Sequence, residues 1–219
     1  MPLAIFDLDD TLLAGDSDHL WGAWLCEQGR ADGAAHAAAN EAFYADYRAG
    51  SLDIAAYLRF ALRPIAGYTT AEIADWQAAF LRDKIAPILL PGAQELIDSH
   101  RQRGDTLLVI TATNEVVAGP IVRQLGVDNL IACGVEVTEG RYTGAPSGTP
   151  SYREGKVVRL QSWLADRDES LAGATFYSDS HNDLPLLQLV DNPIAVDPDP
   201  ALAAHARDKG WRIISLRGA

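Results

Sequence analysis

The sequence contains few cysteines and no long apolar run. Its two cysteines, Cys26 and Cys133, lie far apart and without metal-ligand spacing, so neither a disulfide framework nor a zinc site is predicted. We interpret both as small core residues. No apolar run reaches the roughly 18 residues that a membrane span needs, and no secretory leader is recognisable. We therefore expect a cytoplasmic protein that does not associate with membranes.

Positive charge is also scarce. The chain has 18 Lys and Arg against 30 Asp and Glu, which gives a formal net charge of −12, and it has no basic run. This balance argues against binding to nucleic acid or to anionic membrane surfaces, because both require basic patches. An anionic substrate would need a local positive site, such as a metal ion together with a lysine.

The 219 residues contain 48% hydrophobic and 22% charged residues, as ordinary globular proteins do. This length predicts one large domain, or a core with an insert, that buries enough apolar surface without disulfides or metals.

The most informative stretch lies near the N-terminus. Residues 3–6 form an uncharged apolar run, typical of a strand buried on both faces of a parallel sheet. Asp7 and Asp9 follow directly, at the strand end where open α/β sheets bind ligands. Neighbouring carboxylates repel each other unless a cation compensates, and Mg²⁺ is the cation that we expect. Taken alone, the stretch also fits an acidic turn after a strand.

The segment Asp7-Leu8-Asp9-Asp10-Thr11 resembles motif I of the haloacid dehalogenase superfamily, in the DxDxT form of its phosphatases. The subfamily that contains phosphoserine phosphatase is the most similar. The resemblance implies an α/β protein with a Rossmann-like parallel-sheet core and an inserted helical-bundle cap of the C1 type. The second acid, Asp9, favours phosphoryl chemistry, because dehalogenases of this superfamily lack it.

The position of the cap follows from the helical segments. From residue 19 to about residue 63 the chain is rich in alanine and aromatic residues without strand-like alternation, and Thr69 and Glu72 form a capping box that begins a further helix. We predict a helical cap at 16–88 and a catalytic core formed by 1–15 and 89–219. In the core we expect strands at 105–110, 130–132, 174–178, 193–196 and 211–214, helices at 91–103, 115–125, 156–164 and 200–207, a hairpin at 134–144, and an exposed, mobile loop at 144–150.

Three later segments match further motifs of the superfamily. Thr111 follows the strand at 105–110 and matches motif II, and a hydroxyl before a helix N-terminus suits a phosphate oxygen. Lys156 begins a helix, where the helix dipole disfavours a cation, so we expect an anionic partner; it matches the lysine of motif III. Asp179 and Asp183 match motif IV, although Ser178, Ser180 and His181 replace the glycines and other residues usual in phosphoserine phosphatases. Threonine is common in strands and most lysines are solvated, so either match alone is weak.

The resemblance assigns roles to these residues. Asp7 would be the nucleophile that forms an aspartyl-phosphate, and Asp9 would protonate the leaving alkoxide and later activate water. Thr111 and Lys156 would hold phosphate oxygens, and Mg²⁺ would bind Asp7, the backbone carbonyl of Asp9, and Asp179. Behind them, Asn182 would contact phosphate or the lysine, and Asp183 would orient Lys156 or a metal-bound water.

A capped site favours a small phosphorylated metabolite as substrate. Asp16 matches a glutamate of phosphoserine phosphatases and suits a substrate ammonium group, so we expect an amino-alcohol phosphate. Phosphoserine would also need an arginine for its carboxylate, for which Arg48, Arg59 and Arg63 are candidates. The sequence Asp18-His19-x-Trp21 and His181 instead suit a substrate with a ring and no carboxylate, such as histidinol phosphate, although His19 and Trp21 also fit helix packing. Thr113 is a further substrate-binding candidate.

Two other functions remain open at this point. A phosphotransferase would pass the same phosphoryl group to an alcohol other than water. A non-catalytic, Mg²⁺-dependent metabolite-binding protein is disfavoured, because mere binding requires neither Asp9 nor Lys156. The sequence makes no prediction of the oligomeric state.

Overall fold

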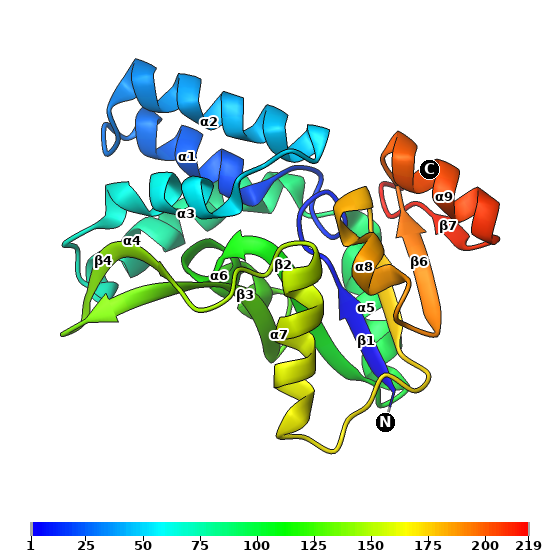
Figure 1. Cartoon of the computed structure of the whole chain (residues 1–219). Coiled ribbons are helices and arrows are strands. Elements are labelled where there is room, and N and C mark those ends of the chain that lie inside the picture. The colour runs from blue at the N-terminus through cyan, green and yellow to red at the C-terminus, as the bar shows by residue number, and fades with distance from the viewer. Residues whose placement is uncertain (1, 219) are drawn as a thin grey trace.

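The computed structural model describes residues 2–218. It has one sheet of seven strands, with helices on both faces and a helical insertion above the carboxyl ends of the central strands (Figure 1). The strand order is β4-β3-β2-β1-β5-β6-β7, and all neighbouring pairs are parallel except β3 and β4. The predicted α/β fold with a Rossmann-like parallel sheet is confirmed.

The first strand lies in the centre of the sheet. The strands are β1 (Leu3–Phe6), β2 (Thr106–Asn114), β3 (Asn129–Thr138), β4 (Arg141–Ser147), β5 (Thr175–Ser178), β6 (Asn192–Val196) and β7 (Arg212–Ile214). All four residues of β1 are buried, as its uncharged sequence predicts. Ala4 and Phe6 pack with α5 (Pro91–Gln102) and α6 (Glu115–Gln124), whereas Leu3 and Ile5 pack with α7 (Glu154–Ala165), α8 (Leu184–Leu187) and α9 (Pro200–Lys209).

Three strands are longer than predicted. β2 continues from Ile110 through Asn114, with a shift in its register against β3. β3 is continuous over ten residues, because its first half pairs with β2 and its second half with β4. β4 extends to Ser147, so the prediction of a mobile loop at 144–150 is wrong for 144–147, where strand pairing satisfies the backbone. The predicted hairpin turn at Glu139 and Gly140 is confirmed.

The insertion between β1 and α5 is helical, as predicted. It contains α1 (Ser17–Glu27), α2 (Gly33–Ala49), α3 (Ile54–Leu62), a 3-10 turn η1 (Arg63–Ile65), α4 (Thr70–Phe80), a π-helical turn η2 (Leu81–Ile85) and a 3-10 turn η3 (Ala86–Ile88). The capping box at Thr69 and Glu72 is present. The division into a cap at 16–88 and a core stays a prediction.

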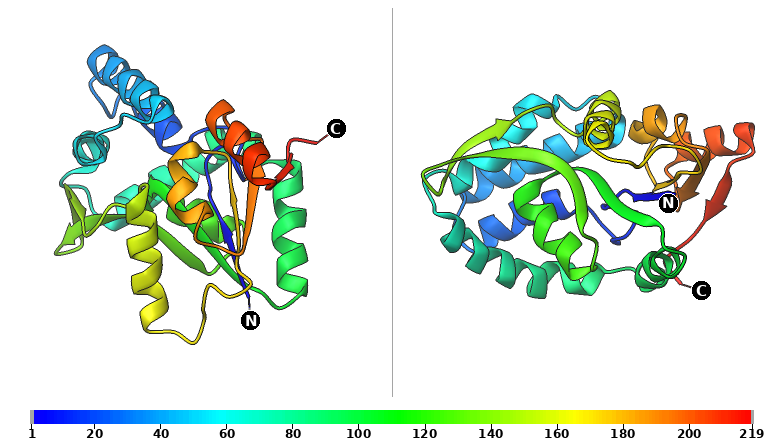
Figure 2. Two further views of the ribbon diagram at one scale, coloured as in Figure 1. Left: turned by 45° about the vertical axis from the view of Figure 1, so that its right-hand side comes forward. Right: turned by 90° about the horizontal axis from the view of Figure 1, so that it is seen from below.

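The helices of the insertion are anchored to different degrees. Trp21 and Trp24 of α1 stack on each other and contact Phe80 at the end of α4, within the same hydrophobic cluster as Phe6 of β1. In α2, by contrast, only His36 and Asn40 are buried, and the helix lies on the outside of the molecule (Figure 2). Among residues 2–218, no helix is long and apolar enough to cross a membrane.

Candidate active site

The predicted motif residues Asp7, Thr111 and Asp179 lie at or near the carboxyl ends of three adjacent strands. Asp7 follows β1 and continues its pairing with β5, because its backbone N–H donates to the carbonyl of Tyr177 at 2.9 Å. Thr111 lies near the end of β2, and Asp179 follows β5. Because parallel strands end at the same edge of a sheet, these side chains meet there. Asp7 is 2% exposed and Thr111 is 1% exposed, so both face the interior.

Lys156 is held between two aspartates. It lies in the first turn of α7, is 2% exposed, and donates from Nζ to Oδ1 of Asp7 and to Oδ2 of Asp183, both at 2.8 Å. Burial alone would lower the pKa of Lys156, but the charges of Asp183 and Asp7 outweigh it and raise the pKa above its usual value. The lysine therefore stays cationic, and these carboxylates are the anionic partners that its position at a helix start requires.

Asp183 and Asn182 have separate positions. Asp183 accepts from Ser178 Oγ at 2.7 Å, which fixes the carboxylate that orients Lys156. Asn182 accepts from Tyr152 and Arg153 and donates from Nδ2 to the carbonyl of Tyr47 in α2 at 3.2 Å. Only the bond to Tyr47 connects α2 to the core, and the predicted contact of Asn182 with phosphate or with Lys156 stays a prediction.

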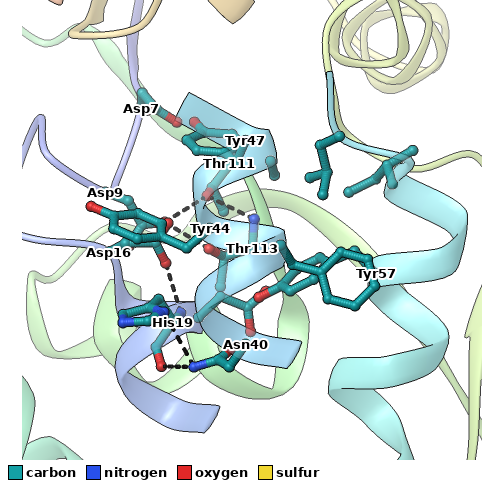
Figure 3. A pocket seen from close by; sticks show the side chains of 15 residues that line it. Asp7, Asp9, Asp16, His19, Asn40, Tyr44, Tyr47, Tyr57, Thr111 and Thr113 are labelled. Carbon is teal, nitrogen blue, oxygen red and sulfur yellow. Dashed lines mark hydrogen bonds between the residues drawn. The ribbon is translucent and has the colours of Figure 1, made fainter. Parts of the chain in front are cut away.

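Asp9 is fixed from two sides. Its Oδ1 accepts from the backbone N–H of Ser17, at the start of α1, at 2.6 Å. Its Oδ2 accepts from the hydroxyls of Thr113 at 2.6 Å and Thr111 at 3.3 Å (Figure 3). Thr113 therefore orients Asp9 in addition to lining the site.

The remaining acids create a strongly negative, buried cluster. Burial raises the pKa of Asp7 to about 7 although Lys156 opposes the shift. Burial and then the charge of Asp7 raise the pKa of Asp179 well above its usual value, while Thr11 donates to Asp179 Oδ1 at 2.9 Å. Within residues 2–218 no three His, Cys, Asp or Glu side chains are arranged as a metal cluster. A cation here would bind Asp7, Asp179 and a backbone carbonyl, a set of few oxygen ligands that suits Mg²⁺.

A pocket of about 470 Å³ extends from these acids to the inner faces of α1, α2 and α3 (Figure 3). Beyond the catalytic acids its walls are formed by two more carboxylates, several aromatic rings and a few polar or aliphatic side chains. The lining residues are Asp7, Asp9, Asp16, Asp18, His19, Asn40, Phe43, Tyr44, Tyr47, Leu52, Ile54, Tyr57, Thr111, Ala112 and Thr113.

Two of the predicted substrate-binding residues from the insertion line this pocket. Asp16 caps α1 by accepting from the backbone N–H of His19 at 2.8 Å. The ring of His19 stacks on Tyr44 with 4.5 Å between centroids, and its Nδ1 lies 3.2 Å from Nδ2 of Asn40. Trp21 instead packs in the core, so the helix-packing interpretation holds for it.

The predicted basic residues lie outside the pocket. Arg48, Arg59 and Arg63 are exposed, and none of them lines it. The guanidinium carbon of Arg48 lies 5.9 Å from the ring centroid of Tyr44. His181 also lies outside, where its Nδ1 is 2.8 Å from Asp199. These residues were plausible because Arg pairs well with carboxylates, but none of their side chains lines the pocket.

The sequence analysis missed the residues that α2 and α3 contribute. Asn40, Tyr44 and Tyr47 recur at intervals of three or four residues, so they share one face of α2. Tyr57 faces them from α3. The available signal was this aromatic stripe on a helix with few other large apolar residues, but such a stripe also fits packing against a core.

Comparisons with known proteins agree with this geometry. Residues 4–188 match the family model of the haloacid dehalogenase-like hydrolases. The chain is 47% identical over 219 residues to a histidinol-phosphatase of Neisseria meningitidis serogroup C (strain 8013), covering 98% of this chain and 99% of that protein. It is 32% identical over 217 residues to phosphoserine phosphatase SerB1 of Mycobacterium tuberculosis (strain ATCC 25618 / H37Rv), covering 98% and 70%. A crystal structure of a protein of unknown function from Bordetella pertussis Tohama I superimposes with a TM-score of 0.92 at 43% identity and 98% coverage of both chains.

Proposed function

The chain belongs to the haloacid dehalogenase-like hydrolases, and we propose that it is a Mg²⁺-dependent phosphatase whose substrate is histidinol phosphate. The observation that carries the choice of substrate is the charge of the pocket. Asp16 and Asp18 line it beside aromatic rings, and no Arg or Lys is among its lining residues. Histidinol phosphate offers an ammonium group and an imidazole ring to such walls, and it has no carboxylate.

Phosphoserine fits the same pocket poorly. Its carboxylate would enter a half-enclosed space near Asp16 and Asp18 without a cation to pair with, and uncompensated like charges away from water are costly. The relative at 47% identity carries the name of a histidinol-phosphatase, which supports the same choice. The relative named as a phosphoserine phosphatase is less similar, at 32% identity.

The chemistry follows from the positions of the chain's own residues. A carboxylate oxygen of Asp7 attacks phosphorus, the bond from phosphorus to the substrate oxygen breaks, and Asp9 gives its proton to the departing alkoxide. Asp9 then takes a proton from the water that cleaves the aspartyl-phosphate. Ser17, Thr111 and Thr113 hold Asp9 in place for both proton transfers. The cationic Lys156 beside Asp7 stabilises the charge of the transferred group.

The metal site is inferred from the same acids. Asp7, Asp179 and the backbone carbonyl of Asp9 would hold Mg²⁺, and the raised pKa of Asp179 is what a carboxylate shows when a compensating cation is needed. Bound Mg²⁺ supplies positive charge that reduces the repulsion between phosphate and Asp7. A cytoplasmic location stays a prediction from the sequence.

The proposal is tested by phosphate release. We expect the protein to hydrolyse histidinol phosphate in Mg²⁺ and to lose this activity in EDTA, with far slower release from phosphoserine, sugar phosphates and p-nitrophenyl phosphate. Product analysis with an added acceptor alcohol distinguishes a phosphotransferase, since a transferred phosphoryl group would appear on the acceptor. Absence of turnover across the panel, with Mg²⁺ bound, would instead support a non-catalytic binding protein.

A further inference from the structure

Asp18 has an unpaired carboxylate oxygen within the pocket. It lies in the first turn of α1, lines the pocket, and is 5% exposed. Its Oδ1 accepts a hydrogen bond from Nδ2 of Asn114 at 2.7 Å. Its Oδ2 is buried and has no hydrogen-bond partner among residues 2–218. Such an oxygen is costly to bury, because it loses the hydrogen bonds that water would provide.

Asn114 fixes the orientation of this carboxylate. It is the N-cap of α6, and its Oδ1 accepts from the backbone N–H groups of Val116 at 3.1 Å and Val117 at 3.3 Å. Because the amide oxygen is occupied by the helix cap, the amide nitrogen is the atom that faces Asp18. One oxygen of Asp18 is therefore held by the core, and the other is buried without a partner among residues 2–218.

The surroundings of Asp18 make its charge expensive in the free protein. Burial raises its pKa to about 7 and the charge of Asp9 adds to the shift, while the hydrogen bond from Asn114 opposes it. Burial, followed by the charge of Asp18, also raises the pKa of Tyr57 well above its usual value. A buried carboxylate that lacks a full set of donors, in a pocket, is typical of a binding site that is completed by a ligand.

The two carboxylates of the α1 start differ in what they offer. Asp16 is half-buried and already accepts a hydrogen bond as a helix cap. Burial, followed by the charge of Asp9, raises the pKa of Asp16 well above its usual value. Asp18 is more deeply buried and interacts with Tyr57, one of the aromatic rings that line the pocket. Aromatic walls favour a flat ring, and the unpaired oxygen of Asp18 requires an N–H donor.

We propose that Asp18, held by Asn114, is a specificity-determining residue that accepts a hydrogen bond from an imidazole N–H of histidinol phosphate, while Asp16 pairs with the ammonium group of the substrate. This inference rests on the proposed function. An amino-alcohol phosphate without a ring leaves Oδ2 of Asp18 unpaired. The protein therefore stabilises the transition state of such a substrate less well. Asp18 therefore selects for the ring as well as attracting it.

The test compares two substrates that differ in the ring. We measure kcat/KM for histidinol phosphate and for phosphoethanolamine, and the ratio of the two is the selectivity. In the Asp18→Asn variant the hydrogen bond from Asn114 holds the amide oxygen, so an NH₂ group replaces the acceptor on the pocket side. We expect the selectivity to fall about ten- to hundredfold, the range for a hydrogen bond to a charged group.

A second variant tests the orientation of Asp18. Asn114→Ser keeps a side-chain acceptor for the start of α6 but removes the donor to Asp18. As a positioning residue, Asn114 acts on the substrate only through Asp18, so its loss should lower the selectivity less, by about three- to tenfold, roughly half the free energy of a hydrogen bond to a charged group. Asp98→Asn, on the exposed part of α5, is the matched control and should keep the selectivity of the wild type. Thermal unfolding confirms that each variant is folded.

The outcomes separate the two proposals. If the wild-type protein does not prefer histidinol phosphate to phosphoethanolamine and phosphoserine, the proposed function is wrong. If the wild type has this preference but folded Asp18→Asn keeps its selectivity within about threefold, less than one such hydrogen bond provides, the role of Asp18 is overturned and the proposed function stands.

Discussion

Asp7 and Lys156 form the buried ion pair around which the catalytic residues are arranged. Lys156 contacts both Asp7 and Asp183 at 2.8 Å, and all three side chains are at most 3% exposed. In such a network each charge depends on the others, because an unpaired charge away from water is strongly destabilising. A substitution that removes the nucleophilic oxygen of Asp7 but keeps the volume of the side chain therefore disturbs this network least.

We expect Asp7→Asn to lower kcat by at least about a thousandfold, because an amide cannot form the aspartyl-phosphate and loss of a nucleophile typically removes most of the catalysis. Asn is isosteric, so Lys156 keeps Asp183 as partner. Single-turnover phosphate release measures the effect, and circular dichroism checks the fold. An Asp7→Asn protein with near-normal turnover would contradict the assignment of Asp7.

A second prediction at the residue scale concerns stability. Because the native pKa of Asp18 is about 7 and its usual value is 3.8, the native state binds this proton more tightly than the unfolded chain. The contribution of Asp18 to the free energy of unfolding is therefore present at low pH and is lost as the pH rises through about 7. We expect Asp18→Asn to raise the midpoint of thermal unfolding relative to the wild type at pH 8 and to raise it less at pH 5. Equal effects at both pH values, or a decrease at pH 8, would show that the buried charge is not costly.

The residues that could be predicted from the sequence share one property. Each is a charged residue at a strand end or helix start where nothing nearby in the sequence explains the charge, as for Asp7, Asp179 and Lys156. A ligand-binding site was therefore the simplest explanation of these charges. Asp18 was singled out only as part of Asp18-His19-x-Trp21, because an acid in the first turn of a helix is by itself ordinary. Its functional features come from Asn114, 96 positions away, and from the unpaired oxygen, and neither can be seen before the chain is folded.

At the scale of elements, the C-terminal end of α2 contacts the core through hydrogen bonds. The chain ends this helix at Gly50, which has a left-handed backbone with φ of +70°. The guanidinium of Arg153 donates to the carbonyl of Gly50 and to Oδ1 of Asn182. A Cβ at Gly50 would lie 2.7 Å from Nε2 of His181, and the left-handed backbone also favours glycine here. Tyr44 and Tyr47 of the same helix line the pocket.

We therefore expect Arg153→Ala to raise KM for histidinol phosphate by about tenfold, since a hydrogen bond from a charged donor contributes about 1.5–3 kcal/mol and part of this stabilises the closed position. The change in kcat should be smaller, because Asp7, Asp9 and Lys156 keep their contacts. Arg167→Ala, an exposed arginine that stacks on Trp163, is the control. Unchanged KM in Arg153→Ala, measured by initial rates, would show that this contact does not hold the cap.

The sequence predicted which segments are strands and helices better than where they end. β1 and the helices with capping signals agree with the structure, because local rules determine them. β2, β3 and β4 run further than predicted, because their ends are held by pairing between distant segments rather than by their own residues. The pocket-lining face of α2 was missed for the same reason, since its partners belong to the core.

At the scale of the whole molecule, Asp7 and Asp179 lie close together at strand ends of a chain whose formal net charge is −12. Burial and the charge of Asp7 raise the pKa of Asp179, so the free protein bears a cost that a bound cation would remove. A ligand that binds the folded state stabilises it by about 2.7 kcal/mol at a hundred times its dissociation constant.

We expect saturating Mg²⁺ to raise the midpoint of thermal unfolding by about 5–10 °C relative to EDTA, from the usual shift of about 2–4 °C per kcal/mol for a chain of this size. Asp179→Asn should remove most of this Mg²⁺-dependent increase, whereas Asp98→Asn should keep it. A full increase in Asp179→Asn would place the cation elsewhere.

The central claim is that the acidic, aromatic pocket selects histidinol phosphate over phosphoserine, and internal competition measures this most directly. An equimolar mixture of the two esters is incubated with the protein and Mg²⁺, and phosphorus NMR follows both, so that their relative consumption gives the ratio of kcat/KM values. We predict that histidinol phosphate is consumed at least about a hundredfold faster, because the substrate carboxylate of phosphoserine finds only Asp16 and Asp18. Equal consumption, or a preference for phosphoserine, would contradict the account.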